Sequence, residues 1–353
     1  MAAEPHTRPE SQPEDRDWRI RTGRPEDQTQ VLGLTPRLAD FELPPWRSAE
    51  EITEADHALL RRTLHMPEAG HFLLVAENSR LGVAGCALVS VKRDFYTRIR
   101  HAHLEVIAIA PEAEGRGLGS TLLAEAEFRA QAAGLPFMTL NVFTGNQRAR
   151  SFYESRDYRL ETLSWRKSLE DSAEEEAVVA PEGVRIDSGS QEDADALLAL
   201  SDRLADFELP PWRSEREIAN CKDGMIMAAL DEQNPGRQSI FVARHGKEIL
   251  GMALISEQRD FFTGDRHGHL EVLVVSPEVE GTGVGSALLG NAERQLREAG
   301  YPFSTLGLFA ANHRARDFYT RHGYVAETLG YRKPLEYDTW TWTGKMPGPR
   351  DGD

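Results

Sequence analysis

The chain has 353 residues, of which 40% are hydrophobic and 28% are charged, a balance typical of a globular protein with material for two cores. Its 41 Lys and Arg against 57 Asp and Glu give a formal net charge of −16, which opposes non-specific binding to nucleic acid or to an anionic membrane. No run reaches the roughly 18 apolar residues of a membrane span, and no secretory signal is visible, so we expect a cytoplasmic protein.

In chain order, residues 1–17 are rich in Pro and charge, and we expect a disordered tail there. Apolar periodicity and turn residues then predict strand 18–23, helix 25–38, strands 71–76 and 83–91, polar loop 93–100, strand 104–110, helix 120–133, strand 136–142, helix 146–155 and strand 158–169. Strands 71–76 and 83–91 are expected to pair antiparallel, and Asn146 is the expected N-cap of its helix. This order predicts an α/β fold, with an α+β mixed sheet and helices on both faces.

The chain then repeats the whole pattern. His103 corresponds to His269 at an offset of 166 positions, and the offset holds along the copies with no insertion or deletion. A repeat of this length indicates duplicated domains rather than a solenoid. We predict domains at 18–170 and 184–336, joined by an acidic linker over 171–183.

Two smaller features complete this organisation. Cys86 and Cys221 fall at non-equivalent places in the two copies and form no ligand motif, which favours free thiols in a reducing cytoplasm over a disulfide. Residues 337–353 form a C-terminal tail, in which Trp340 and Trp342 leave open a further edge strand.

The stretch 104–123, LEVIAIAPEAEGRGLGSTLL, predicts an anion-binding turn. An apolar strand ends at Pro111, and a glycine-rich turn leads into a helix, whose N-terminal N–H groups and dipole favour a phosphate. A tight strand-to-helix connection is the simpler alternative. The second copy favours the phosphate interpretation, because it has the same glycine spacing. The glycines are Gly115, Gly117 and Gly119, with Gly281, Gly283 and Gly285 in the second copy.

This strand, turn and helix, followed by a strand and an Asn-x-x-Ala-x-x-Phe-Tyr helix, resemble the GNAT superfamily of N-acetyltransferases in both copies. The resemblance implies two tandem GNAT-like acyl-CoA N-acyltransferase domains, an arrangement similar to that of mycothiol synthases. The family's Gln/Arg-x-x-Gly-x-Gly/Ala motif is matched except at its first position, where Glu114 and Glu280 stand. In the second copy Thr282 also replaces a common basic residue.

The resemblance further implies acetyl-CoA as the cofactor. In the family the backbone of the central strand pairs with the pantetheine arm, the turn binds the pyrophosphate, and the Asn of the later helix lies beside the cofactor. The positions so implied are Ile107, Ala108, Ile109, Gly115, Arg116, Gly117, Leu118, Gly119, Ser120 and Asn146, and in the second copy Leu273, Val274, Val275, Gly281, Thr282, Gly283, Val284, Gly285, Ser286 and Asn312. Tyr153 and Tyr319 are the implied acids for the departing thiolate, with core packing as the alternative.

A polar row on the central strand supplies candidates for the base. His101, His103 and Glu105 alternate, so their side chains share one face, and the second copy repeats the row at His267, His269 and Glu271. Desolvation is expected to raise the pKa of Glu105 towards neutral. We predict Glu105 and Glu271 as general bases acting through water, followed by His103 and His269. A zinc site and a satisfied polar ladder are the alternatives.

The segment RLADFELPPWRS is identical in the two copies, at 37–48 and 203–214. It falls where the family builds its acceptor pocket, and acids with an indole suit a cationic amine. The substrate-binding candidates are Asp40, Glu42, Trp46, Asp206, Glu208 and Trp212. The alternative is that the aromatic residues pack in the core or between the domains.

We therefore expect an N-acetyltransferase that moves the acetyl group of acetyl-CoA to a primary amine of a small molecule or peptide by direct attack. We expect no metal, nucleic-acid or membrane partner, and the oligomeric state stays open. The alternatives are a chain with one catalytic and one structural or CoA-sensing domain, and a non-catalytic acyl-CoA-binding module.

Overall fold

The computed structural model describes residues 18–66, 70–170, 179–231 and 238–335. The expected tails, with Trp340 and Trp342, and most of the expected linker lie outside the described residues. The strands are β1 (Arg19–Thr22), β2 (Phe72–Asn78), β3 (Gly82–Arg93), β4 (Arg100–Ile109), β5 (Phe137–Phe143), β6 (Arg159–Ser168), β7 (Val184–Ser188), β8 (Gln238–His245), β9 (Glu248–Arg259), β10 (Arg266–Val275), β11 (Phe303–Phe309) and β12 (Val325–Pro334). The helices are α1 (Gln28–Gly33), α2 (Ala49–His65), α3 (Leu118–Ala132), α4 (Gln147–Glu154), α5 (Ala194–Ser201), α6 (Glu215–Leu230), α7 (Val284–Glu298) and α8 (His313–Arg321).

The strands and the later helices lie where the sequence predicts them, within a few residues, but the first helical region differs. The helix predicted over 25–38 is divided into a 3-10 turn, α1 and a second 3-10 helix, η3 (Thr35–Ala39). Pro36 donates no N–H and disfavours helical backbone at the residue before it, which prevents one continuous helix. The sequence prediction also omits α2. A capping box marks its start, because Ser48 and Glu51 each accept a hydrogen bond from the other's backbone N–H.

All strands in the described part of the chain belong to one 12-stranded sheet, in the order β1-β2-β3-β4-β5-β12-β6-β11-β10-β9-β8-β7. The sheet is mixed, since β4 pairs parallel with β5 and β10 pairs parallel with β11. Helices cover both faces, as predicted. In the first half (18–170), α1 and α2 pack on one face with Leu73 and Val75, whereas α3 packs on the other with Leu74.

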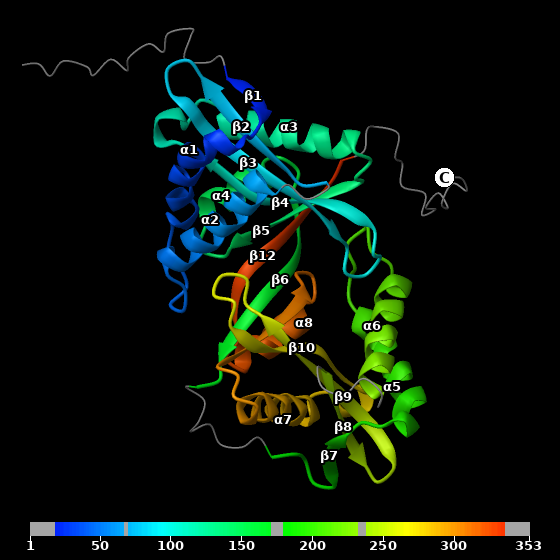
Figure 1. Ribbon diagram of the computed structural model, residues 1–353. Helices are drawn as coiled ribbons and strands as arrows, with labels where there is room; N and C mark the ends of the chain where they lie inside the picture. The colour runs from blue at the N-terminus through cyan, green and yellow to red at the C-terminus, as the bar shows by residue number, and fades with distance from the viewer. Residues whose placement is uncertain (1–17, 67–69, 171–178, 232–237, 336–353) are drawn as a thin grey trace, which may run out of the picture.

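The last strand of each half is exchanged into the other half. β12 lies between β5 and β6, and β6 lies between β12 and β11, so β5 has its antiparallel neighbour from the second half (184–336) (Figure 1). Ion pairs reinforce the exchange: Lys167 of β6 contacts Glu293 of α7 at 2.9 Å, and Lys333 of β12 contacts Glu127 of α3 at 2.7 Å. The halves are thus interlocked. Their boundaries at 170 and 184 stay a prediction about the repeat.

The core and the register add two details. One cluster of buried side chains runs from α3 across the exchanged strands to α7, so the halves share a continuous core. In the first half, Leu74 of β2 pairs with Ala87 of β3. The equivalent residues of the second half are Ile240 and Ala253, but Ala253 pairs with Phe241 instead. The prediction of no insertion or deletion is therefore wrong here, because β8 is shifted by one residue relative to β2 and the following turn compensates.

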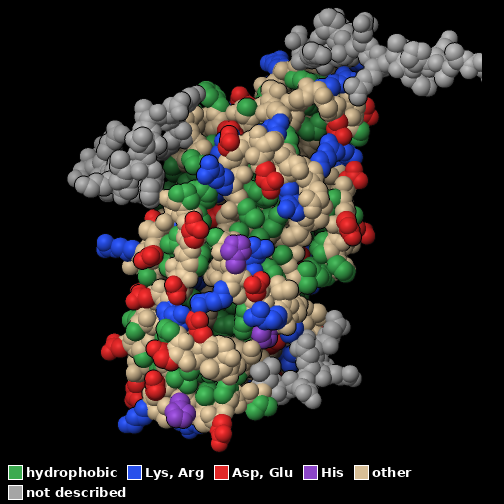
Figure 2. Space-filling view, turned by 180° about the vertical axis from the view of Figure 1, so that it is seen from behind, with side chains coloured by type: hydrophobic (Ala, Val, Ile, Leu, Met, Phe, Trp, Pro, Cys, Tyr) green, Lys and Arg blue, Asp and Glu red, His purple; other side chains and the backbone are tan. Residues whose placement is uncertain are grey.

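Charges of both signs are interspersed on the face shown in Figure 2.

Candidate active site

The turn after β4 leads into α3 through two glycines with left-handed backbone. Gly115 has φ of +70° and Gly117 has φ of +81°, and a Cβ at either would meet no atom within 4 Å. Gly117 is the N-cap of α3, and no side chain caps this helix end. The first N–H groups of α3 therefore face an open turn that suits a phosphate. Gly281 and Gly283 repeat the turn before α7, with φ of +72° and +95°.

Beside this turn, β4 separates from its parallel neighbour. β4 pairs with β5 over Ala102–Leu104, whereas its pairing with β3 continues to Ile109. A β-bulge at Glu105 lies where the separation begins, because consecutive residues of β3 pair with Leu104 and Val106. Among the described residues, the β5-facing edge of 107–109 has no strand partner and is available to an extended ligand. The pairing of β10 with β11 likewise stops at Leu270.

A cavity of about 840 Å³ joins these features. From the first half it is lined by the glycine turn, the unpaired part of β4, Asn146, Tyr153 and carboxylates that include Asp56 and Glu105. The second half contributes Gln258, Arg259, Asp260, Phe261, Phe262, His267, His269, Thr305, Leu306, Glu327 and Thr328. Both halves therefore build the site beside the first glycine turn.

Contacts join the polar row of β4, of which His103 and Glu105 line this cavity. His101 Nε2 and His103 Nδ1 lie 3.0 and 2.7 Å from Thr139 Oγ1. His103 Nε2 lies 3.6 Å from Glu105 Oε2. Burial lowers the pKa of His103 to about 3, so its imidazole is neutral at pH 7.

Glu105 is held in its charged form. Ser90 Oγ donates to its Oε1 at 2.6 Å, and Lys92 Nζ lies 2.8 Å from the same oxygen. Burial raises the pKa of Glu105, but the charge of Lys92 and the hydrogen bonds from Lys92 and Ser90 bring it below its usual value. The expectation of a pKa raised towards neutral is therefore wrong. A carboxylate with a lowered pKa is a weak base at pH 7.

The second half repeats the row with different cations. Ser256 Oγ donates to Glu271 Oε1 at 2.7 Å, and burial lowers the pKa of His269 to about 4. Gln258 stands in place of Lys92 and donates to Glu271 Oε1 at 3.3 Å. The cation comes instead from α6, where Lys222 Nζ donates to the backbone oxygen of Glu271 at 2.9 Å.

The implied asparagines and tyrosines occupy equivalent places in the two halves. Asn146 caps α4, as predicted, by accepting a hydrogen bond from Ala149 N at 2.9 Å, and Asn312 caps α8 in the same way. Tyr153 is only 6% exposed although it lines the cavity. Burial raises the pKa of Tyr153 and of Tyr319 above the usual value, so both hydroxyls keep their protons at pH 7.

The acid at the first position of the glycine motif is neutralised by arginines that the sequence analysis did not assign. Glu114 Oε1 accepts from Arg37, and Arg148 Nη2 lies 2.9 Å from the same oxygen. Hydrogen bonds from Arg148 and Arg37 lower the pKa of Glu114 despite partial burial. Arg156 donates to Ser120 at the start of α3 and also lines the cavity. These guanidinium groups add positive charge beside the glycine turn. Arg37 belongs to the identical segment, which was the available signal.

The other residues of the identical segment divide between the cavity and the contact between halves. Asp40 lines the cavity and pairs with Arg37 at 2.5 Å. Glu42 is exposed, and neither Glu42 nor Trp46 is among the described residues that line the cavity. The indole of Trp46 instead donates to Glu327 Oε1 of β12 at 2.7 Å. This contact favours the alternative interpretation, packing between the domains.

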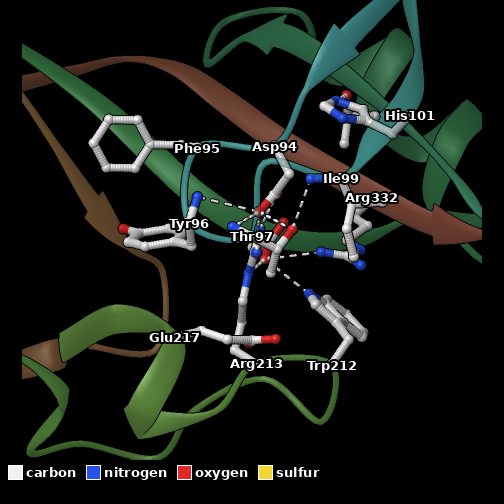
Figure 3. A network of polar contacts seen from close by, with 12 residues as sticks. Asp94, Phe95, Tyr96, Thr97, Ile99, His101, Trp212, Arg213, Glu217 and Arg332 are labelled. Carbon is white, nitrogen blue, oxygen red and sulfur yellow. Dashed lines mark hydrogen bonds and ion pairs between the residues drawn. The ribbon is translucent and has the colours of Figure 1, made fainter. Parts of the chain in front are cut away.

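The second copy of the segment makes the reciprocal contact. Asp206 and Glu208 are exposed, and Trp212 Nε1 donates to Glu161 Oε1 of β6 at 2.8 Å. Arg213 donates to both carboxylate oxygens of Asp94 at 2.7 Å and to Glu161 at 2.6 Å (Figure 3). The Trp and Arg side chains of each copy of the segment therefore bind carboxylates of the other half.

Two further observations bear on the class of protein. Among the described residues, no three or more His, Cys, Asp or Glu side chains are grouped so as to hold a metal ion. In the same part of the chain, no helix has the length and apolar character needed to cross a membrane.

A mixed sheet whose parallel central strands separate beside a glycine-lined helix N-terminus defines an acyl-CoA-dependent acyltransferase fold. The model of the acetyltransferase (GNAT) family matches residues 35–158 and 198–324, most of the chain, and the chain belongs to this family. It is an acyltransferase, and the acetyltransferases of this family use acetyl-CoA as co-substrate.

Three similar proteins agree with this assignment. Aminoalkylphosphonate N-acetyltransferase from Salmonella typhimurium is 29% identical over 41% of this chain and 86% of its own length. Mycothiol acetyltransferase from Propionibacterium freudenreichii is 30% identical over 49% of this chain and 53% of its own length. The crystal structure of a GCN5-related N-acetyltransferase from Sphaerobacter thermophilus covers 93% of this chain and 98% of that chain, with a TM-score of 0.56 and 18% identity, and shares the fold.

Proposed function

We propose that the protein transfers the acetyl group of acetyl-CoA to a primary amine of a small molecule or peptide, by direct attack of the amine. The observation that carries this proposal is that one cavity joins the glycine turn, the separated strand β4 and the anionic Glu105. The cavity can therefore hold an acetyl donor and an ammonium group next to each other.

We infer that the glycine turn holds the pyrophosphate and that the free edge of 107–109 receives the pantetheine arm. The left-handed glycines, the uncapped start of α3 and the nearby Arg148 and Arg156 support this placement. The same roles are proposed for 281–286 and 273–275 in the second half.

We infer three roles for side chains at the reacting end. Glu105, anionic at pH 7, attracts the ammonium of the acceptor, and neutral His103 orients it through the Thr139 contact. Tyr153, whose phenol keeps its proton, donates it to the departing thiolate. Glu271, His269 and Tyr319 are proposed for the same roles in the second half. The names of the aminoalkylphosphonate and mycothiol relatives favour a small-molecule acceptor.

The test is calorimetric titration of acetyl-CoA into the full chain, with free CoA as control, followed by thiol release with a panel of primary amines. We expect acetyl-CoA to bind and at least one amine to be acetylated. No heat and no shift in melting temperature would contradict the cofactor assignment. Binding without turnover by any amine would favour a non-catalytic acyl-CoA-binding module.

One observation favours a second candidate, a chain with a single catalytic half. The second glycine turn has Thr282 in place of Arg116, and His322 in place of Arg156 at the helix start. Fewer fixed positive charges at that turn weaken attraction of the pyrophosphate. The titration should then resolve two binding sites with different affinities for acetyl-CoA.

We also propose a cytoplasmic location, on the basis of the free thiols Cys86 and Cys221.

A further inference from the structure

Asp56 is a buried carboxylate in the cavity that no role described above uses. It lies on α2 one turn from Ile52 and one turn from Leu60, on the face that packs against the sheet, and is only 7% exposed. It lines the cavity together with Lys92 and Glu105. Among the described residues, no hydrogen-bond donor and no cation contacts its carboxylate.

A buried carboxylate without a partner is costly unless it is protonated or meets a cation. Burial, followed by the charge of Glu105, raises the pKa of Asp56 to about 7. The residue therefore exchanges its proton near neutral pH, as an efficient general base must. It also faces a space where a ligand's cation would relieve its desolvation.

The second half shows which charge this place accepts. Lys222 of α6 occupies the position of Asp56 in the repeat, and its ammonium lies 2.9 Å from the backbone oxygen of Glu271. The cation on the neighbouring strand is lost at the same time, since Gln258 replaces Lys92. The second half thus contains its own ammonium group beside the bulge of β10, whereas the first half has a carboxylate and a cavity.

We propose that Asp56 binds the ammonium group of the acceptor and takes its proton, and that Lys222 occupies this place in the second half. Only the first half then acetylates an external amine, which is the second candidate function described above, and Glu271, His269 and Tyr319 do not act on such an amine. The proposal rests on the proposed function and assigns the general base for it.

The transfer moves two protons and exchanges a C–S bond for a C–N bond. The carboxylate of Asp56 takes one proton from the ammonium, and the free amine attacks the thioester carbonyl carbon. A C–N bond forms, the C–S bond breaks, and the CoA thiolate leaves with a proton from Tyr153. The second proton lost by the nitrogen restores Tyr153, and Asp56 releases its proton to solvent.

Other titratable groups interact with Asp56 or line the same cavity. Glu105 on β4 and Cys86 on β3 interact with it electrostatically, and His103 on β4, Lys92 on β3 and Arg37 on η3 line the cavity. The elements α1 and β2, which also pack against α2, contribute no residue to the described lining of the cavity. Burial raises the pKa of Cys86 to about 12, and His103 is neutral, so neither changes charge near pH 7. Asp56 is therefore the group expected to titrate there.

The test compares Asp56→Asn with Glu54→Gln, which removes an exposed charge from the same helix. For wild type and Glu54→Gln we expect kcat/KM with a primary amine to rise with pH through an inflection near 7, because the base must be deprotonated. For Asp56→Asn we expect a loss of about 100-fold or more and no inflection. Acetyl-CoA binding by calorimetry should be unchanged, which also shows that the variant is folded.

The outcomes distinguish a failure of the Asp56 assignment from a failure of the proposed function. Normal wild-type turnover together with an Asp56→Asn variant that keeps its rate and inflection would overturn the assignment of the base. If the second half acetylated the same amine, Asp56→Asn would retain roughly half of the turnover, and the role of Lys222 would be refuted. A wild type without turnover would overturn the proposed function instead. Asp56→Glu, which keeps a carboxylate in the cavity, should retain the inflection at a reduced rate.

Discussion

Arg47 donates to both carboxylate oxygens of Asp260, at 2.7 and 2.5 Å, across 213 positions of sequence and from one half to the other. Asp260 lies in the loop between β9 and β10 and lines the cavity beside the first glycine turn. This ion pair therefore serves two purposes: it joins the halves and it positions a wall of the first site. Arg213 and Asp94 form the reciprocal pair.

Removing one partner of this ion pair should destabilise the protein strongly. Arg47→Ala leaves Asp260 and Glu327 buried without their cation, and we expect the free energy of unfolding to fall by about 3–5 kcal/mol in urea titrations. Arg47→Met combined with Asp260→Leu should cost less than the single change, because no unpaired charge remains at that pair. A single variant as stable as wild type would contradict a structural role for the pair.

The same pair predicts a loss of stability in acid. Burial raises the pKa of Asp260, but hydrogen bonds from Arg47 and from backbone N–H groups bring it down to about 2. Because the folded pKa lies below the unfolded value of about 4, the stabilisation is complete above pH 4 and is lost as the pH falls towards 2. Unfolding free energies measured from pH 2 to 7 should show this fall. Asp260→Asn should flatten it, and an unchanged slope would count against the assignment.

Gly117 should be required for binding acetyl-CoA. Its φ of +81° costs about 1–2 kcal/mol for alanine, so Gly117→Ala is expected to shift the start of α3 and weaken acetyl-CoA binding by about 10-fold in calorimetry. Gly33→Ala is the control, because Gly33 lacks a positive φ and a Cβ there meets no atom within 4 Å. Equal affinities for Gly117→Ala and wild type would remove the turn from the site.

Tyr153 should affect turnover rather than binding. Tyr153→Phe keeps the buried ring but removes the acid proposed for the thiolate, and we expect kcat to fall about 100-fold with unchanged affinity for acetyl-CoA. Tyr301→Phe is the matched control, since the hydroxyl of Tyr301 donates to Glu257 and the residue lies outside the cavity lining. A normal kcat for Tyr153→Phe would leave core packing as the role of this ring.

The exchanged strands predict that the halves depend on each other. If 18–170 and 184–336 are produced separately, β6 lacks its partner β11, and β12 lacks its partner β5, because each partner belongs to the other half. We expect the co-expressed pieces to form a one-to-one complex by light scattering. Each piece alone should show a lower melting temperature or self-association. Two stable monomeric pieces would show that the exchange is dispensable for folding.

The sequence alone determined the local features of this protein. The glycine turn at Gly115 and Gly117, the Asn146 cap and the polar row of β4 depend on residues a few positions apart, and their spacing was sufficient to predict them. The resemblance to the GNAT family follows from the same local motifs, although Glu114 departs from the family pattern at the first position. The duplication was visible because the same motifs recur 166 positions later in the sequence.

The tertiary structure decided the features that depend on distant contacts. Both last strands carry an Arg-Lys pair, Arg166-Lys167 and Arg332-Lys333, and the two patterns are too similar to indicate which one pairs with β5. The pKa of Glu105 was mispredicted because its lowering cation, Lys92, lies on another strand. Asp56 was missed because the helix that carries it, α2, was not predicted, and because no local pattern shows which groups lie opposite a helix. Such properties arise only when segments far apart in the chain are brought together.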